Sequence, residues 1–248
     1  MQEFMVRPGD SLYNISIEYG IPLVQLIRAN PQLSDINQLR IGQVIYLPYL
    51  LSVPEQLMIL ESNAEYIMDD IFGLEWQDAE ERLNVIRSNM SDLEPLLQNA
   101  SVPQTLISRI NSAIQLLDQN IGQRRRYPAI AQANIINSYI PDILDYFEEV
   151  VPSDLERLDY LGRSIIFNVD NRDWAEANAN YLRLKPVWDR LKQRLNRVYA
   201  NDVSQFDQYL SDLAGSINRR DYRSAINNAT NMLNLLEVLE ANFIEQYS

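Results

Sequence analysis

The feature that most constrains how this chain folds is a short motif that returns at nearly constant spacing through residues 54–248. An acidic residue, an aromatic, two variable residues and an alanine stand at Glu75–Ala79, Asp173–Ala177 and Asp221–Ala225. A degenerate copy at Arg126–Ala129 puts the four aromatics at positions 76, 127, 174 and 222, which are 51, 47 and 48 residues apart. Repeats of this length are typical of stacked helical units, because one such unit cannot bury its apolar face alone.

Each copy has the apolar spacing of a helical hairpin. Leu57, Leu60 and Ala64, for example, recur three and four residues apart. The module shows no strand-like alternation, and it also aligns with itself at an offset of 98 residues. The pattern therefore predicts an all-α module of four tandem helical hairpins (about eight helices), which form two related four-helix halves at residues 51–150 and 151–248. Three prolines fall inside predicted helices and should bend or end them: Pro95, Pro141 and Pro186.

The first 50 residues differ in composition and predict a separate small domain. They hold Gly9, Gly20 and Gly42 out of seven glycines, and three basic residues against four acidic ones. Turn signals separate a strand-like run near Phe4, two short amphipathic helices and a second strand at 44–47. The joint at 48–54 is short and apolar. It predicts a docked connection, since flexible tethers are polar.

Three segments of this domain together resemble the LysM domain. They are Val6-Arg7-Pro8-Gly9-Asp10-Ser11-Leu12-Tyr13-Asn14-Ile15-Ser16, the stretch from Tyr19-Gly20-Ile21 to Asn30-Pro31, and Leu39-Arg40-Ile41-Gly42-Gln43-Val44-Ile45-Tyr46-Leu47-Pro48. The resemblance covers about residues 3–48, where residue types and spacing agree jointly. It implies a small α+β domain of βααβ order at residues 1–50. The helical remainder resembles no family that we can name.

LysM domains bind the N-acetylglucosamine-containing glycans of peptidoglycan and chitin. The resemblance therefore implies a shallow groove between the loop after the first strand and the loop after the second helix. The residues of these loops are Pro8, Gly9, Asp10, Ser11, Leu12, Ala29, Asn30, Pro31, Gln32 and Leu33. Backbone amide and carbonyl groups in such turns can pair with acetamido and hydroxyl groups. The alternative for single residues is structural, because Gly9, Asp10 and Ser11 also suit a turn and a helix cap, and Leu12 also suits a core.

Composition excludes several classes of protein. Cysteine and histidine are absent, which removes disulfides, thiol nucleophiles, histidine bases and zinc sites built from these residues. We expect no cofactor and no metal. The net charge of −13 argues against a nucleic-acid partner, and no apolar stretch reaches the roughly 20 residues that span a membrane. The run Arg124–Arg126 suits a phosphate contact, although acidic surroundings favour a solvated loop.

Without histidine and cysteine, carboxylates are the catalytic groups that remain among those familiar from cell-wall enzymes. Glu61-Ser62 matches the dipeptide of lytic transglycosylases, but the segment that follows it in that family is absent. We therefore predict that the chain is not an enzyme. The alternative is a peptidoglycan glycosidase that uses Glu or Asp carboxylates of the helical module.

The sequence thus predicts a non-catalytic cell-envelope protein. Its LysM domain would bind peptidoglycan or a chitin-type oligosaccharide, and its acidic helical scaffold would bind other envelope proteins. The LysM pattern begins within a few residues of Met1, with no leader-like segment before it. This arrangement is similar to leaderless LysM proteins of spore-forming bacteria, which implies synthesis in the cytoplasm and a place in the spore cortex or coat. A removed leader and an accessory of a phage or contractile apparatus are the alternatives.

Overall fold

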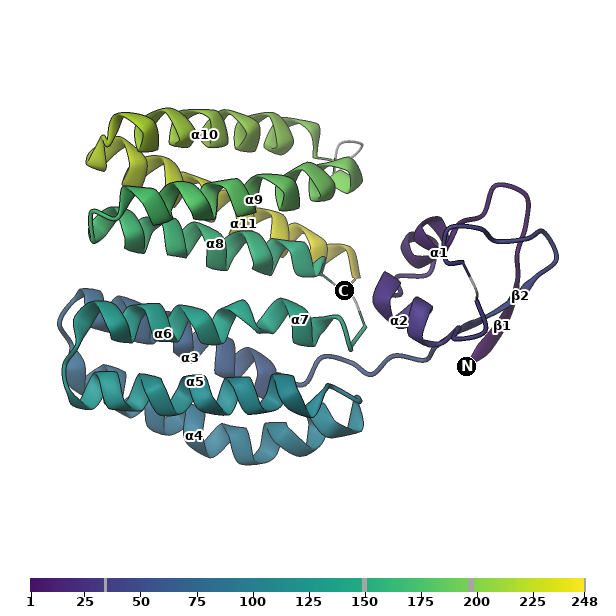
Figure 1. Ribbon diagram of the computed structural model, residues 1–248, viewed down its shortest axis with the longest axis horizontal. Coiled ribbons are helices and arrows are strands. Elements are labelled where there is room, and N and C mark those ends of the chain that lie inside the picture. The colour runs from purple at the N-terminus through teal and green to yellow at the C-terminus, as the bar shows by residue number, and fades with distance from the viewer. Residues whose placement is uncertain (34, 149–150, 196–198, 248) are drawn as a thin grey trace.

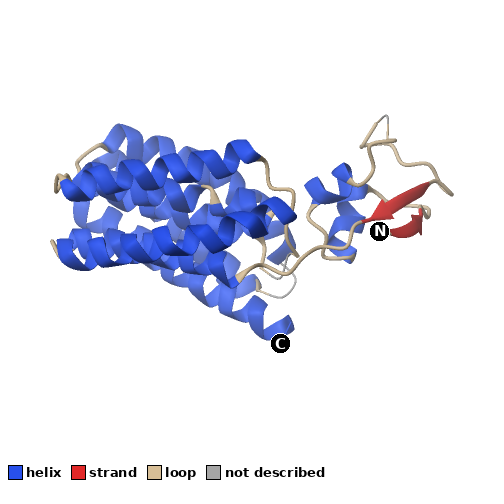
Figure 2. Cartoon of the chain, turned by 90° about the horizontal axis from the view of Figure 1, so that it is seen from below, coloured by secondary structure: helices blue, strands red, loops and turns tan. Residues whose placement is uncertain are grey.

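The computed structural model describes residues 1–33, 35–148, 151–195 and 199–247, with side chains described as far as residue 243. A small N-terminal domain lies at one end of a long helical module (Figure 1). The helices of the module run side by side along the long axis, and the two strands lie at the far side of the small domain (Figure 2). In the described residues, no helix is both long and apolar enough to cross a membrane.

The N-terminal domain has the predicted order of strand, helix, helix and strand. Its elements are β1 (Gln2–Met5), α1 (Leu12–Glu18), α2 (Leu23–Arg28) and β2 (Val44–Leu47). The strands pair antiparallel, with Phe4 opposite Ile45. Both of these side chains are buried, and they form one apolar cluster with Val6, Leu12, Ile15, Ile21, Leu26 and Leu47. The alternation of buried and exposed residues in the strands places the two helices against one face of the sheet.

The rest of the chain is helical. Its helices are α3 (Glu55–Phe72), α4 (Trp76–Asn99), α5 (Gln104–Gly122), α6 (Arg126–Ser138), α7 (Ile140–Leu144), α8 (Ser153–Asp170), α9 (Trp174–Leu195), α10 (Ala200–Arg219) and α11 (Tyr222–Tyr247). Consecutive helices pack in the pairs α3–α4, α5–α6, α8–α9 and α10–α11. α6 packs on α3, and α11 packs on α8. One apolar core lies among α3–α7 and a second among α8–α11.

The expectation that a proline ends its helix early is confirmed at Pro141. Pro141 stands at the start of α7, just after α6 ends at Ser138. Pro95 and Pro186 instead lie inside the continuous helices α4 and α9. Their missing amide hydrogen bonds therefore do not divide these two helices.

Four turns with the same backbone geometry join the paired helices at the end of the module far from the small domain (Figure 1). We call them the distal turns. Each holds one residue in the left-handed region: Leu74 (φ 65), Arg124 (φ 50), Arg172 (φ 62) and Arg220 (φ 54). The amide of the next residue donates to the carbonyl five positions back, as in Glu75 to Asp70 at 2.7 Å. This bond closes a helix C-terminus in the manner of a Schellman motif.

The distal turns correct one detail of the sequence repeat. The alanines five residues after these positions are all fully buried: Ala79, Ala129, Ala177 and Ala225. In this register Arg126, and not Tyr127, stands where the other copies have Trp76, Trp174 and Tyr222. The spacing of the copies is therefore 50, 48 and 48 residues. The core alanine is a better marker of the repeat than the aromatic, because the alanine is the residue that close helix packing requires.

The small domain is docked on the helical module, as the apolar joint predicts. The Gln25 side chain donates to the carbonyl of Asp145 at 2.9 Å, and the Arg28 guanidinium lies 4.2 Å from the centre of the Tyr146 ring. Leu51 of the joint forms an isolated parallel bridge with Phe147. These contacts tie α2 and the joint to the segment that follows α7.

Candidate functional site

The first predicted glycan loop is a tight turn between β1 and α1. The Arg7 amide donates to the Asp10 carboxylate at 2.7 Å, and Gly9 has φ +88 with no atom near the position of an added Cβ. Ser11 caps α1 by accepting from the Asn14 amide at 3.1 Å. The side chains of Asp10 and Ser11 therefore hold the turn and the helix start, while Pro8 and Gly9 are exposed.

The second predicted loop is built around Asn30. Its side chain is 2% exposed. The amide nitrogen donates to the carbonyls of Leu26 and Tyr46, both at 2.8 Å. The amide oxygen accepts from the Tyr46 amide at 2.7 Å and from the Gln32 side chain at 2.9 Å. Asn30 thus locks the end of α2 to β2, and this side chain is fully engaged within the protein.

The ten predicted residues therefore divide into two groups. Leu12 is 3% exposed and belongs to the core, which was the structural alternative for this residue, so its side chain is not available to a sugar. Asn30 is likewise a structural residue. The exposed members are Pro8, Gly9, Pro31 and Gln32, and Ala29 and Leu33 are half-buried. The exposed members are uncharged and offer backbone groups, proline rings and one amide, which suits a neutral N-acetylated sugar, while the half-buried Asp10 carboxylate accepts from the Arg7 amide.

Both loops rest on the same apolar cluster. Leu12 of the first loop is part of this cluster, and Leu33 of the second packs against it. Ala29 faces the other way and lines a shallow cavity of about 470 Å³ between the two parts of the protein. The far wall of that cavity includes Ala100, Ser101 and Tyr146 of the helical module. The second loop therefore borders the module, and a glycan on it would approach the start of α5.

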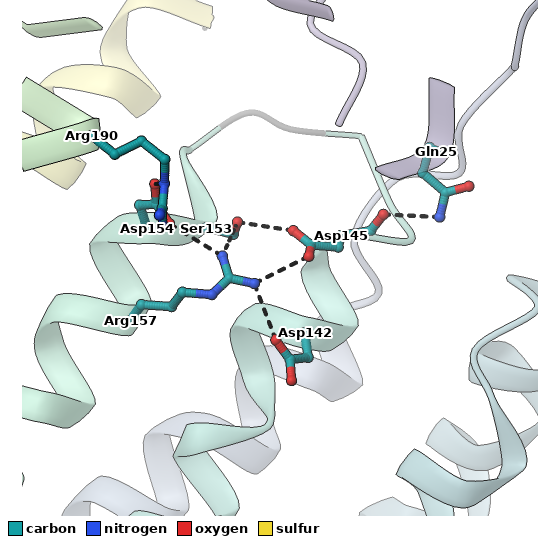
Figure 3. A network of polar contacts seen from close by, with 7 residues as sticks. All are labelled: Gln25, Asp142, Asp145, Ser153, Asp154, Arg157 and Arg190. Carbon is teal, nitrogen blue, oxygen red and sulfur yellow. Dashed lines mark hydrogen bonds and ion pairs between the residues drawn. The ribbon is translucent and has the colours of Figure 1, made fainter. Parts of the chain in front are cut away.

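A charge network holds the docking segment in place (Figure 3). The Arg157 guanidinium contacts the carboxylates of Asp142 and Asp145 at 3.1 Å each, and that of Asp154 at 3.4 Å. Arg190 of α9 binds Asp154 at 2.6 Å. Burial raises the pKa of Asp145, and the positive charge of Arg157 opposes that rise. The network fixes the backbone of Asp145, whose carbonyl receives the Gln25 side chain.

A second candidate site, which we call the carboxylate groove, lies between α3, α8 and α11. It is a half-open cavity of about 410 Å³. Seven acidic side chains line it: Glu55, Glu61, Glu65, Glu156, Asp159, Glu237 and Glu240. Arg163 is the one basic residue in the described part of this lining, and it binds Asp159 at 2.7 Å and Glu65 at 3.1 Å. The groove therefore has many more acidic than basic side chains.

Burial changes the protonation of these carboxyls. It raises the pKa of Glu61 from 4.5 to about 7, although a hydrogen bond with the Glu156 side chain lowers it. Burial, with Asp159 nearby, raises the pKa of Glu65 to about 8. The pKa of Glu156 also rises well above its ordinary value because of burial and the adjacent Glu61. The hydrogen bond between these two side chains lowers the pKa of Glu61 and raises that of Glu156, so Glu156 is the donor and Glu61 the acceptor.

Sequence reasoning noted Glu61 only for its dipeptide and missed the groove. The groove joins α3 with α11, whose contributing residues lie more than 170 positions apart in the chain. One sequence signal could have indicated the groove, which is an acidic residue at a helical position that the apolar spacing predicts to be buried. Glu61 is such a residue, since it lies with Leu57 and Leu60 on the buried side of α3.

Another acidic group stands at the first distal turn. Single carboxylate oxygens of Asp70, Glu75 and Asp78 lie within 4.8 Å of one another. Arg82 already binds Asp70 at 2.7 Å. The other two residues stand at the start of α4, where acidic groups are stabilised by the helix dipole. We assign no metal to this group.

Comparison with known families gives one match. Residues 4–48 match the family model of the LysM domain, so the N-terminal domain is a LysM domain. The remainder of the chain matches no family. The comparisons with curated proteins and with solved structures give no match to this chain.

Proposed function

We propose that this chain, which carries a LysM domain at its N-terminus, is a non-catalytic protein of the cell envelope. The domain binds N-acetylglucosamine-containing glycan, with peptidoglycan as the main ligand. The observation that carries the proposal is the match of residues 4–48 to the LysM domain. The exposure of four uncharged residues on these two loops, Pro8, Gly9, Pro31 and Gln32, supports it.

The proposed role of the helical module is an acidic scaffold for other envelope proteins. Its four helix pairs and two apolar cores support an organisation of four tandem hairpins in two related halves. The LysM domain is docked on this scaffold through Gln25 and Arg28. The scaffold would therefore be held close to the glycan in a defined orientation. Within the envelope, the spore cortex or coat is the setting that we propose, on resemblance alone.

Co-sedimentation of the full chain with purified, insoluble peptidoglycan tests this function. The chain is expected to sediment with the glycan and to be released by soluble chito-oligosaccharides. Pro31→Glu places a charge on the exposed second loop and should weaken this retention. Gln38→Glu makes a similar change at an exposed position outside both loops, and it should leave retention unchanged. Equal retention of the two variants would place the glycan elsewhere.

A peptidoglycan glycosidase is the second candidate, and the carboxylate groove favours it. A carboxyl whose pKa stands near 7, as that of Glu61 does, is suited to act as a general acid. Among the described residues, the non-acidic lining is mainly aliphatic, with Met58, Ile59, Leu155 and Leu236, and it holds no aromatic residue for a sugar ring to stack on. Release of soluble muropeptides that is lost in Glu61→Gln would establish this activity and overturn the non-catalytic proposal.

A further inference from the structure

The distal turns concentrate positive charge at one end of an acidic chain. Six arginines are exposed there: Arg124, Arg125, Arg172, Arg219, Arg220 and Arg223. We call this surface the arginine end. The whole chain has only 21 basic residues and a net charge of −13, so this surface opposes the overall charge.

Contacts between helices hold three of the distal turns together. The Asp170 carboxylate at the end of α8 accepts from the Tyr127 hydroxyl at 3.3 Å and from the Tyr222 hydroxyl at 3.0 Å. The Arg172 guanidinium lies 3.9 Å from the centre of the Tyr222 ring. The second, third and fourth turns therefore meet around Asp170 and form one continuous surface.

The aspartates that begin α9 and α11 accept hydrogen bonds within their own turns. Asp173 accepts from the Glu176 amide at 3.0 Å, and Asp221 accepts from the amide and hydroxyl of Ser224. Within the described part of the chain, none of the six exposed guanidinium groups forms an ion pair. Three carboxylates, those of Asp170, Asp173 and Asp221, lie beside the six guanidinium groups, so positive charge exceeds negative charge on this surface.

The backbone adds a second, independent observation. Three of the six arginines, Arg124, Arg172 and Arg220, occupy the left-handed position of their turns, whereas the first turn has Leu74 there. Glycine is the residue that this position favours, because a Cβ is strained in the left-handed region. The repeat thus places an arginine at the same position of three turns, which gathers positive charge at one end of the module.

The arginine end and the carboxylate groove lie toward opposite ends of the helical module. The arginine end follows the last residues of α5, α8 and α10, whereas Glu55, Glu156 and Glu240 belong to the opposite ends of α3, α8 and α11. A helix of this length spans roughly 30 Å, so the two surfaces of one molecule cannot meet. Salt screens charge beyond about 10 Å, so the overall negative charge does not cancel the arginine end.

We propose that the arginine end of one molecule binds the carboxylate groove of a second copy of this chain. The groove is half-open, and its seven acidic residues share one arginine. Guanidinium groups bind carboxylates through paired hydrogen bonds. The two surfaces differ, so the contact is heterologous and forms either a reciprocal dimer or a longer head-to-tail array. This contact does not depend on glycan binding.

Sedimentation velocity of the full chain tests the proposal. The average sedimentation coefficient should rise with protein concentration at low ionic strength and fall back when salt is raised, because the contact is electrostatic. The triple variant Arg124→Gly, Arg172→Gly and Arg220→Gly should weaken association by roughly tenfold or more, while its thermal midpoint stays equal or rises. Leu74→Gly is the matched control, since it makes the same backbone change without loss of charge, and its association should equal that of the wild type.

A mixing experiment identifies the partner surface. The variant Glu237→Gln and Glu240→Gln keeps the arginine end but weakens the groove, and the triple glycine variant keeps the groove. At a concentration where the wild type associates, each variant alone should stay largely monomeric, and an equimolar mixture should form a 1:1 complex.

Three results would overturn the proposal. The first is a wild-type chain that stays monomeric at every concentration. The second is association that the glycine substitutions leave intact. The third is a mixture of the two variants that forms no complex. A monomeric chain that binds long-chain inorganic polyphosphate through these arginines would assign the surface to an anionic polymer instead.

Discussion

Replacing Glu61 by glutamine should make the folded protein more stable at alkaline pH and should flatten the pH dependence of its stability. The Glu61 side chain is 8% exposed, and burial raises its pKa from 4.5 to about 7. Between these two values the folded protein holds a proton that the unfolded chain has released. The free energy of unfolding therefore falls as pH rises through this window, and the fall ends above about 7.

The size of the effect follows from the two pKa values. The difference between 4.5 and about 7 corresponds to roughly 3 kcal/mol of unfolding free energy. Because Glu61 and Glu156 titrate together, this amount belongs to the pair. Glutamine releases no proton, and its amide oxygen can still accept the hydrogen bond that Glu156 donates. The variant should thus resemble the wild type near pH 5 and exceed its stability by as much as about 3 kcal/mol near pH 8.

Denaturant unfolding, followed by circular dichroism across this pH range, measures the difference. Glu55→Gln is the matched control, since Glu55 lines the same groove but is exposed to water, and it should keep the pH dependence of the wild type. If Glu61→Gln shows the same pH dependence as the wild type, the carboxyl is solvated and our description of the groove is wrong.

Three further changes test the packing. Asn30→Ala removes four hydrogen bonds and leaves the Tyr46 backbone unpaired, so the LysM domain should lose about 2–3 kcal/mol; hydrogen exchange should quicken there and not in the helices. Trp188 is fully buried and stacks on Phe206 at 3.8 Å. Trp188→Ala should therefore cost about 3–5 kcal/mol, and a calorimetric loss below about 1 kcal/mol would contradict this packing. Leu74→Gly relieves a left-handed leucine and should raise stability by up to about 1 kcal/mol; a lower thermal midpoint would contradict the strain.

Local signals in the sequence predicted the elements of both parts of the protein. The glycine and proline turns near Gly9 and Gly20 marked the βααβ order, and three- and four-residue apolar steps marked the helices. Aromatic residues were a weaker guide to register, since Tyr127 lies one position beyond the structural equivalent of Trp76. Proline was the weakest signal for a helix end, because α4 and α9 continue through Pro95 and Pro186.

The site was harder to predict because it depends on which side chains are buried or hydrogen-bonded within the protein. Sequence alone could not show that the Asn30 side chain forms its hydrogen bonds with the end of α2 and with β2, or that Leu12 is buried. The carboxylate groove and the arginine end both arise from helices that are distant in the chain. Their parts appear in sequence as an isolated Glu61 and a run at Arg124–Arg126, each with an ordinary explanation until the helices are packed.

The central claim is that the LysM domain binds N-acetylglucosamine oligomers through its two exposed loops. A titration of the isotope-labelled full chain with chito-oligosaccharides, followed by amide resonances, tests it most directly. The account predicts saturable shifts centred on Gly9 and Gln32, with little change in α8–α11. Resonances of both loops that stay in place at millimolar ligand would contradict it.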